Sequence, residues 1–298
     1  MDIRASRYFA AVAQHNSIRD AADALNVAQS ALSRQILKLE ETFGVRLFER
    51  LPRGVTLTAA GEVYLRYARD QIAQAEHMRA EFHALNGMHR GRVRISAIES
   101  LTRSLLPRLI AAFREQHPGV GFDVKMDGSE HIIEAVREID TDIGITYYPQ
   151  PASDLAVRVS AREPLVAIVA AGHALAQKKS IGLRDVAAFP TALTTRGSRS
   201  RSLIDTACWK AGVSLSPVLE PNSVEMLTGL AARSDTVTFL LRLSAEDGVR
   251  AGTLAAVPVR SEILNMGTIE VLTRVSRKLS PVSEEFLGFL GTELASGG

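Results

Sequence analysis

The sequence predicts an α/β protein with a small, mostly helical N-terminal domain and a larger, two-lobed C-terminal domain. Three observations predict this class. Apolar residues recur at helical spacing through most of the first 58 residues, a long helical stretch follows, and from residue 91 short apolar strands alternate with helices. The 298 residues are 46% hydrophobic and 23% charged, which is typical of a folded globular chain of one to three domains.

The N-terminal stretch predicts three helices in close succession. Apolar residues follow helical spacing from Ile3 to Val12, and Ser17 can cap a second helix. Asn26 is a natural turn residue, and a third helix is expected from about Ala28 to Thr42. Its buried face would consist of apolar residues at positions i, i+4, i+7 and i+11, namely Leu32, Ile36, Leu39 and Phe43.

The polar side of the third helix gathers toward its N-terminal half. It comprises Gln29, Ser30, Ser33, Arg34 and Lys38. In helix-turn-helix proteins this part of the second helix of the pair reaches base edges in the major groove of DNA. Gln and Arg can each form two hydrogen bonds with one base, whereas Ser is short enough for phosphates or bridging water. Each residue taken alone fits a solvated helix face equally well.

A short basic segment follows the third helix. Apolar stretches flank a turn at Pro52 to Gly54, which predicts a two-stranded hairpin, here called the wing. Arg50 and Arg53 would lie at its tip, beside phosphates or in the minor groove. Helix, turn, helix and basic wing together favour contact with double-stranded DNA over a merely solvated surface. We therefore expect a winged helix-turn-helix domain over residues 1–58.

A long helix is expected to start near residue 59, with Thr58 as its cap. Its apolar residues follow in steps of three and four, the pattern of a coiled-coil seam: Tyr64, Ala68, Ile72, Ala75, Met78, Phe82 and Leu85. The seam predicts a homodimer and hence a near-palindromic DNA site. The alternative is an amphipathic helix packed on its own domain. Asn86, Gly87 and Gly91 predict a hinge, and the linker is assigned to residues 59–90.

Residues 91–298 contain two successive sets of strands and helices. Each set reads strand, helix, strand, helix, strand, which predicts an α/β lobe with a mostly parallel sheet. One helix is expected from about Ser100 to Gln116, with Pro107 near its first turn. Lobe I would comprise residues 91–162 and 266–298, and lobe II residues 163–265.

Ligands of open α/β sheets bind beyond the carboxyl ends of the strands, where helix N-termini favour carboxylates. We expect this crevice to be lined from lobe I by Glu99, Ser100, Leu101, Thr102, Gly128, Ser129 and Thr146, and from lobe II by Thr194, Thr195, Arg196, Gly197 and Asn222. Arg196 could hold a carboxylate through two hydrogen bonds, and Glu99 could bind an amine or pair with Arg196. The alternative for Ser100, Thr102 and Ser129 is that they only cap helices.

Several classes of protein find no support in the sequence. No P-loop, GxGxxG after a strand, GxSxG or HExxH pattern occurs, and the seven histidines lack the spacing of metal ligands. We expect no catalytic residue, metal or cofactor. The first residues lack a signal-peptide pattern and no apolar run could span a bilayer, so a cytoplasmic protein with no membrane partner is expected. Cys208, the only cysteine, is expected to be a small buried residue rather than a redox group.

Many N-terminal residues match the pattern of one known family. They are Phe9, Ala21, Ala22, Leu25, Gln29, Ser33, Arg34, Leu39, Glu40, Gly44, Leu47, Phe48, Arg50, Leu57, Thr58, Gly61 and Glu62. In these positions the chain resembles the LysR-type transcriptional regulators. The resemblance implies that Gln29, Ser30, Ser33 and Arg34 contact DNA, as does the basic wing at Arg53. Two departures are Ala28, where the family often has a capping serine worth about 1 kcal/mol, and Ser30, where it often has proline.

The resemblance covers nearly the whole chain. The segments RVRISAIESLTRSLLPRLIAAFREQHPGV, GHALA, SLIDTACWKAGV and RKLSPVSEEFLGFL are similar to successive parts of the LysR effector domain, which has a periplasmic-binding-protein-like fold. Residues 231–241 depart from that pattern, because they lack its usual glycines and trailing proline. The resemblance also implies dimerisation through the linker helix, a homotetramer, and RNA polymerase as a further partner.

These observations predict a DNA-binding transcriptional regulator. Its promoter binding would be modulated by a small molecule, such as a small organic acid or a similar metabolite, bound between the two α/β lobes. The alternatives are a solute-binding protein and an enzyme on an α/β scaffold, since a fold does not fix a function.

Overall fold

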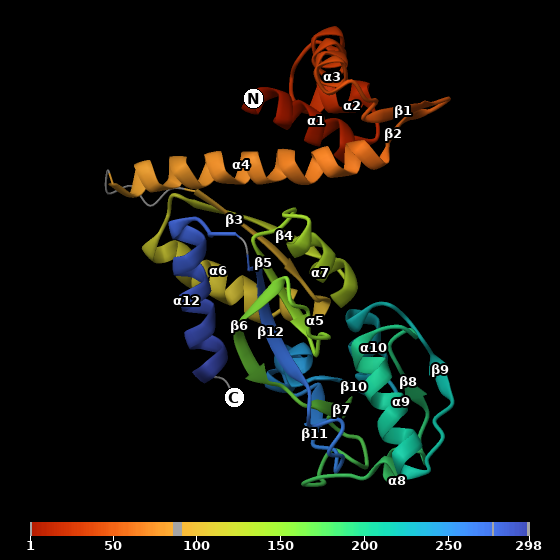
Figure 1. Ribbon diagram of the computed structural model, residues 1–298. Coiled ribbons are helices and arrows are strands. Elements are labelled where there is room, and N and C mark those ends of the chain that lie inside the picture. The colour runs from red at the N-terminus through yellow and green to blue at the C-terminus, as the bar shows by residue number, and fades with distance from the viewer. Residues whose placement is uncertain (1, 86–90, 276, 297–298) are drawn as a thin grey trace. The chain divides into compact units, whose positions relative to one another are not determined.

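The computed structural model describes residues 2–85, 91–275 and 277–296. Along the chain it divides into two compact units, with the boundary near residue 88. Figure 1 labels the elements of each unit. No helix in the described ranges is both long enough and apolar enough to cross a membrane.

The first unit contains the predicted three helices, hairpin and long helix. The helices are α1 (Ile3–His15), α2 (Ile18–Ala24), α3 (Gln29–Phe43) and α4 (Ala59–Leu85), and the hairpin is formed by β1 (Phe48–Leu51) and β2 (Gly54–Leu57). Asn16 ends α1 in the left-handed conformation, and the Ser17 hydroxyl accepts a hydrogen bond from the Asp20 N–H, as a cap should. Asn26 also has positive φ, which confirms the predicted turn.

Three aromatic rings form the centre of this small domain. The ring of Phe9 lies 4.7 Å from that of Phe48 and 4.7 Å from that of Tyr64, so α1, the wing and α4 meet there. On α3, Leu32, Ile36 and Leu39 are buried as expected. Phe43 was expected in the same face but is 41% exposed, because it lies in the last turn of α3 and contacts only the edge of this cluster, through Tyr64.

The long helix has two different halves. Tyr64 and Ala68, expected in a coiled-coil seam, belong to the core of their own domain, so the alternative of intrachain packing holds for this half. Farther along, Met78 and Phe82 are 48% and 56% exposed. Of the predicted hinge, Asn86 and Gly87 lie outside the described residues, and Gly91 begins a strand instead.

The second unit is built on two five-stranded sheets. The first sheet has the strand order β4-β3-β5-β12-β6 and the second has β11-β7-β10-β8-β9. The first consists of β3 (Gly91–Ala97), β4 (Val120–Met126), β5 (Ile143–Tyr147), β6 (Leu155–Arg162) and β12 (Thr268–Arg274). The second consists of β7 (Leu165–Ala170), β8 (Thr191–Ala192), β9 (Pro217–Leu219), β10 (Val237–Leu241) and β11 (Leu254–Val257).

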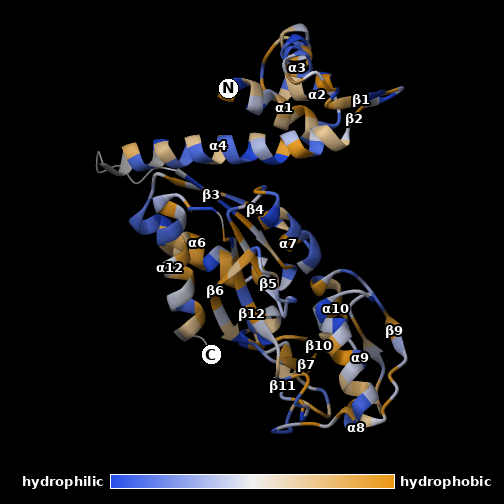
Figure 2. Cartoon of the chain, in the orientation of Figure 1, coloured by the Kyte–Doolittle hydropathy of each residue, from blue (hydrophilic) through white to orange (hydrophobic). Residues whose placement is uncertain are grey.

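Helices cover both sheets. The first sheet carries α5 (Glu99–Thr102), α6 (Leu105–Gln116), α7 (Ser129–Arg137) and α12 (Pro281–Ser296), and Figure 1 shows α6 and α12 beside each other. The second carries α8 (Leu183–Val186), α9 (Arg199–Ala211), α10 (Val224–Ala231), a 3-10 turn at Arg242–Ala245 and α11 (Glu246–Arg250). In Figure 2 the central strands β7 and β10 are mostly hydrophobic, and both are buried almost throughout.

The expectation of mostly parallel sheets is wrong. Each sheet has two parallel and two antiparallel pairings among the described strands. The antiparallel pairings involve β12 in the first sheet and β7 in the second. Both strands follow a direct passage between lobes, since only Glu163 and Pro164 separate β6 from β7. Parallel strands are joined by a crossover, usually a helix packed on their own sheet. A strand that the chain enters from the other lobe lacks this crossover and can run antiparallel to its neighbours.

The single helix expected between Ser100 and Gln116 is interrupted. It consists of α5 and α6, with a break at Arg103 and Ser104. The cause is Pro107, whose ring in a continuous helix would clash with the carbonyl of the residue four positions earlier, Arg103. At the C-terminal end, Phe286 is fully buried and its ring lies 5.2 Å from Phe113 and 4.9 Å from Phe122. The last helix therefore packs onto lobe I, as predicted.

Candidate functional site

The polar surface of α3 lies opposite its buried side. Gln29, Ser30, Arg34 and Lys38 are exposed, and Ser33 is half-buried. Ser30, Arg34 and Lys38 are spaced by four residues and share one face of the helix. The structure thus brings together the five α3 residues that the sequence singled out.

The start of α3 is uncapped. Ala28 is the N-cap residue and makes no side-chain hydrogen bond to the first turn, as its methyl group requires. The N–H groups of Gln29 and Ser30 therefore lack a capping acceptor among the described residues. Such a helix start presents donors to an oxyanion, because its partial positive charge is not neutralised by a side chain.

The wing is anchored at both ends. The carboxylate of Glu40 accepts hydrogen bonds from the N–H groups of Leu47, at 2.8 Å, and Phe48, at 3.1 Å. Gly54, at φ +98°, approaches the Asn16 carbonyl so closely that a Cβ atom there would lie 2.3 Å from the oxygen. This anchoring role of Glu40 was not predicted, and the only signal for it in the sequence was the position of Glu40 in the family pattern.

The two wing arginines occupy different places. Arg53 lies in the turn between β1 and β2, as predicted. Arg50 was expected at the tip as well but lies within β1, where it pairs with Val55. The hairpin turn is tight, and it has room only for Pro52 and Arg53.

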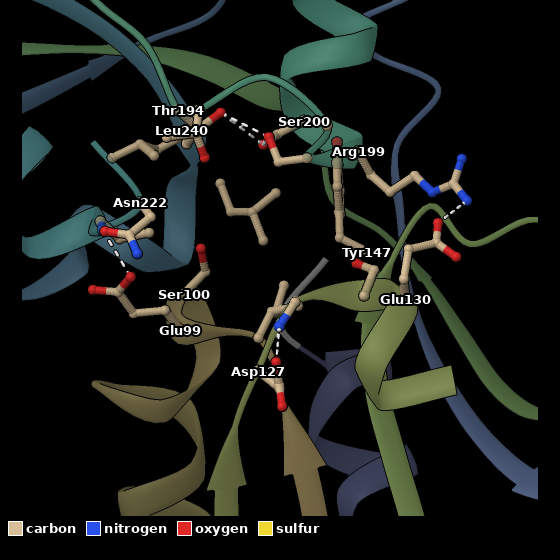
Figure 3. Close-up of a pocket in the computed structure, with 18 of the residues that line it drawn as sticks. Glu99, Ser100, Asp127, Glu130, Tyr147, Thr194, Arg199, Ser200, Asn222 and Leu240 are labelled. Atoms are coloured by element: carbon tan, nitrogen blue, oxygen red, sulfur yellow. Dashed lines mark hydrogen bonds and ion pairs between the residues drawn. The ribbon is translucent and has the colours of Figure 1, made fainter. Parts of the chain in front are cut away.

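A cavity of about 610 Å³ lies in the second unit, at the carboxyl ends of strands of both sheets. Nine of the predicted residues line it: Glu99, Ser100, Gly128, Ser129, Thr194, Thr195, Arg196, Gly197 and Asn222. Figure 3 shows several of them around the open space. The volume is in the range of pockets for small organic molecules.

Three predicted lining residues do not reach the cavity. Leu101 is fully buried in the core of lobe I, and the hydroxyl of Thr102 donates to the carbonyl of Glu99, at 2.9 Å. Thr146 is also fully buried, because successive strand residues point to opposite faces and the next residue, Tyr147, lines the cavity instead.

Sequence reasoning missed about half of the lining. The missed residues are Ile98, Met126, Asp127, Glu130, His131, Tyr147, Leu165, Ser198, Arg199, Ser200, Val224, Leu240 and Leu241. Many of them directly follow a strand or begin a helix, which is the signal that could have found them. Tyr147 donates to the Glu163 carbonyl at 3.1 Å, and burial raises the pKa of its phenol, so it stays neutral.

Glu99 has a different role from either one expected. Its carboxylate accepts hydrogen bonds from the N–H groups of Val224, at 2.8 Å, and Glu225, at 3.2 Å, and from the Ser223 hydroxyl, at 3.3 Å. It therefore pairs with the N-terminus of α10 and not with Arg196. Figure 3 shows this carboxylate directed at the segment that carries Asn222.

The start of α9 forms the other polar wall. The hydroxyls of Thr194, Ser198 and Ser200 lie 3.0 to 3.3 Å from one another. Arg199 forms an ion pair with Glu130 of lobe I. Arg196 is exposed, and its side chain makes no ion pair or hydrogen bond with any residue that the structure describes. Hydroxyls, a guanidinium and a helix start suit an anionic group.

The described ranges contain no group of three or more His, Cys, Asp or Glu side chains that could hold a metal ion. Cys208 is buried, and burial raises the pKa of its thiol to about 11. A buried thiol of such high pKa is almost entirely protonated near neutral pH and is a poor nucleophile.

Comparison with known proteins decides the family. The model described as "Bacterial regulatory helix-turn-helix protein, lysR family" matches residues 3–62, and that of the "LysR substrate binding domain" matches residues 86–295. The chain belongs to the lysR family. It is a DNA-binding transcriptional regulator whose activity is modulated through its substrate-binding domain. The family is one of regulators, which decides against an enzyme and against a solute-binding protein.

Relatives of this lysR-family chain match it from end to end. The transcriptional dual regulator GltC of Bacillus subtilis is 31% identical over 97% of this chain and 96% of its own. A RuBisCO operon transcriptional regulator of Acidithiobacillus ferrooxidans is 29% identical over 98% of this chain and 94% of its own.

Solved structures share the fold of the whole lysR-family chain. A full-length OxyR variant from Pseudomonas aeruginosa superposes with a TM-score of 0.76, at 23% identity, over 99% of this chain and 94% of its own. Full-length CbnR in complex with its target DNA superposes with a TM-score of 0.65, at 21% identity, over 97% of this chain and 99% of its own. The predicted winged helix-turn-helix and two-lobed α/β classes are thereby confirmed.

Proposed function

We propose that the regulator reads DNA with the polar face of α3. Gln29, Ser33 and Arg34 contact base edges, and Ser30 and Lys38 contact phosphates. The observation that carries this assignment is the exposure of Gln29, Ser30, Arg34 and Lys38 on a helix whose apolar side chains are buried. The uncapped N–H groups of Gln29 and Ser30 add donors for one phosphate.

The wing supplies contacts beside the major groove. Arg53, at the turn, reaches the minor groove or its phosphates, and Arg50, within β1, faces the backbone closer to α3. Support comes from the anchoring of the wing by Glu40, which holds both arginines at a fixed distance from α3.

The effector is a small organic acid or a similar metabolite in the 610 Å³ cavity. Its acidic group binds at Arg196 and the start of α9, where the three hydroxyls of Thr194, Ser198 and Ser200 gather. Arg196 supports this assignment, because its charge has no counter-ion among the described residues that line the cavity.

Effector binding shifts the population of two arrangements of the lobes or subunits, and so changes the spacing or bending of bound DNA. The DNA-binding part comprises residues 1–58, the linker residues 59–90 and the effector part residues 91–298. The regulator acts as a dimer through the linker helix and as a homotetramer, in the cytoplasm, on near-palindromic promoter sites. RNA polymerase is a further partner.

Electrophoretic mobility-shift assays test the proposal. The full chain is titrated onto the DNA upstream of its own gene and of the adjacent gene, with unrelated DNA of the same length as control. Specific retardation that changes on addition of a small organic acid is the expected result. Equal retardation of all fragments, with or without any acid in a metabolite panel, would reject it.

A further inference from the structure

Glu99 and α10 form an unusual contact inside the cavity. Glu99 comes from α5 of lobe I, whereas α10 belongs to lobe II, so the contact joins the two lobes. The carboxylate binds the first two N–H groups of α10, those of Val224 and Glu225. A carboxylate at a helix start is stabilised by both the free N–H donors and the helix dipole.

The N-terminus of α10 is therefore saturated. The N–H of Met226 donates to the Ser223 hydroxyl at 3.3 Å, and that of Leu227 donates to the Ser223 carbonyl at 3.3 Å. With Val224 and Glu225 bound to Glu99, each N–H group of this first turn has an acceptor from the chain itself. A ligand anion could reach these donors only by displacing Glu99.

The start of α9 is different. Of the N–H groups in the first turn, the Ser198 hydroxyl accepts a hydrogen bond from that of Arg201, which leaves the N–H groups of Arg199 and Ser200 without a capping acceptor in the described part of the chain. The Arg199 Nε atom is buried and also has no hydrogen-bond partner there. The exposed guanidinium of Arg196 lines the same side of the cavity.

We propose that Glu99 determines which effectors the cavity binds. Its carboxylate occupies the anion-binding position at the N-terminus of α10, so no ligand anion can bind there. The cavity therefore takes an effector with one anionic group, which binds at Arg196 and the start of α9. The proposal rests on the cavity being the effector site.

Charge explains how a second anionic group is rejected. Besides Glu99, the lining contains the carboxylates of Asp127 and Glu130, and Glu130 already pairs with Arg199. With Arg196 occupied by the first carboxylate, a dicarboxylate would place its second charge against these groups, and the described lining residues offer no second unpaired arginine or lysine. Like charges a few ångströms apart in a partly dehydrated site repel strongly. Another part of the lining, which includes Met126, Leu165 and Leu240, is apolar and suits an uncharged body.

The test uses sodium acetate, a minimal monocarboxylate, and the full chain. In Glu99→Ala the N–H groups at α10 lose their acceptor, so we expect the Tm to fall by about 2–4 °C. Acetate should fill the vacated position and raise the Tm of this variant saturably above the effect of equal sodium chloride. Asp123→Ala is the matched control, because it removes from lobe I a carboxylate that pairs with Arg92 and does not line the cavity. Acetate should give it no gain beyond that of the wild type.

Acetate-soaked crystals show the positions directly. In the wild type, acetate should lie at Arg196 and the start of α9 and not on Val224; in Glu99→Ala, a second acetate should lie on the N–H groups of Val224 and Glu225. Acetate on Val224 in the wild type, none at Arg196, or an equal Tm gain for all three proteins would overturn the proposal. If Glu99→Ala does not fold, the position of acetate in the wild-type crystal still tests the proposal. If the full chain failed to bind DNA specifically, that result would reject the proposed DNA-reading surface of α3. It would not change what the acetate experiments say about the cavity.

Discussion

Glu130, in the first turn of α7, forms an ion pair with Arg199, the first residue of α9. A carboxylate of lobe I is thereby paired with a guanidinium of lobe II, and both residues line the cavity. The Glu130 side chain is 67% exposed, so solvent screens the pair and its contribution to stability is about 0.2–1 kcal/mol. A contact of this strength can hold the lobes together without preventing their rearrangement.

The coupling of this pair can be measured by a double-mutant cycle. Glu130→Ala, Arg199→Ala and the double variant are unfolded with urea in the absence of effector. We expect a coupling of about 0.2–1 kcal/mol, which disappears at high salt because the pair is partly exposed. Strictly additive effects of the two substitutions at low salt would show that the pair contributes nothing.

The two DNA-binding arginines should behave differently. Arg34→Ala should weaken binding to the specific site by about 1–3 kcal/mol, with little effect on non-specific DNA, because it removes contacts with a base. Fluorescence anisotropy with labelled duplexes measures both affinities. Equal losses on specific and non-specific DNA would contradict the base-reading role of Arg34.

Arg53→Ala should weaken binding to all duplexes alike. Because one phosphate contact is lost, the slope of log K against log salt should fall by about one unit. Arg250→Ala is the control, since it removes an arginine that is 70% exposed on α11 of lobe II. An unchanged salt slope for Arg53→Ala would exclude a phosphate contact.

Asp142 should dominate the acid stability of lobe I. Its side chain, 6% exposed, accepts hydrogen bonds from the N–H of Arg94, at 3.0 Å, and from its guanidinium. Burial raises the pKa of Asp142, but the charges of Arg94 and Arg277 outweigh it and leave the pKa below its usual range. The stabilisation is therefore complete above the unfolded-state pKa and is lost as pH falls through the lower folded-state pKa.

Asp142→Asn should reduce the free energy of unfolding by about 3–5 kcal/mol at pH 7, because it removes the buried charge that pairs with both Arg94 and Arg277. The loss of stability on acidification below about pH 4 should also become shallower. Urea unfolding from pH 7 to pH 3 measures both. Asp123→Asn, which removes a half-exposed partner of Arg92 from the same sheet, should cost less than about 1 kcal/mol.

The exposed half of α4 should carry the dimer contact. Met78→Glu places a carboxylate in the proposed seam and should weaken dimerisation about tenfold or more, since an unpaired charge is costly to bury. Glu76→Gln changes the charge by the same amount at an exposed position of α4 on the other side of the helix from Met78, and it should have little effect. Sedimentation equilibrium distinguishes the two variants. A Met78→Glu protein with unchanged dimer affinity would place the interface elsewhere.

The features that the sequence predicted correctly depend on local signals. Ser17, Asn26 and Thr58 act through neighbours within a few residues, and the structure has each in its predicted role. Periodic apolar residues gave the order of helices in the first unit and the two lobes of the second. The cavity was placed correctly because ligand sites in such sheets follow from strand direction.

The features that were missed depend on contacts between distant residues. The carboxylate of Glu99 binds a helix more than 120 residues later in the chain, and no local pattern indicates that partner. Strands β6 and β11 were not predicted, although turn-forming residues flank them, Pro151 before β6 and Gly252 and Pro258 around β11. Thr146 was assigned to the cavity because the strand was expected to end at Thr146, one residue before the actual end of β5 at Tyr147. Successive side chains of a strand point to opposite faces, so an error of one residue selects a side chain on the wrong face.

Selection from random duplex DNA is a direct test of whether the surface of α3 reads bases. It requires no knowledge of the target genes. The wild-type chain and Arg34→Ala are each used to select bound duplexes, which are then sequenced. We expect the wild type to enrich a near-palindromic motif and Arg34→Ala to lose the preference at particular positions of each half-site. Enrichment of no motif by the wild type, or of an identical motif by both proteins, would contradict this expectation.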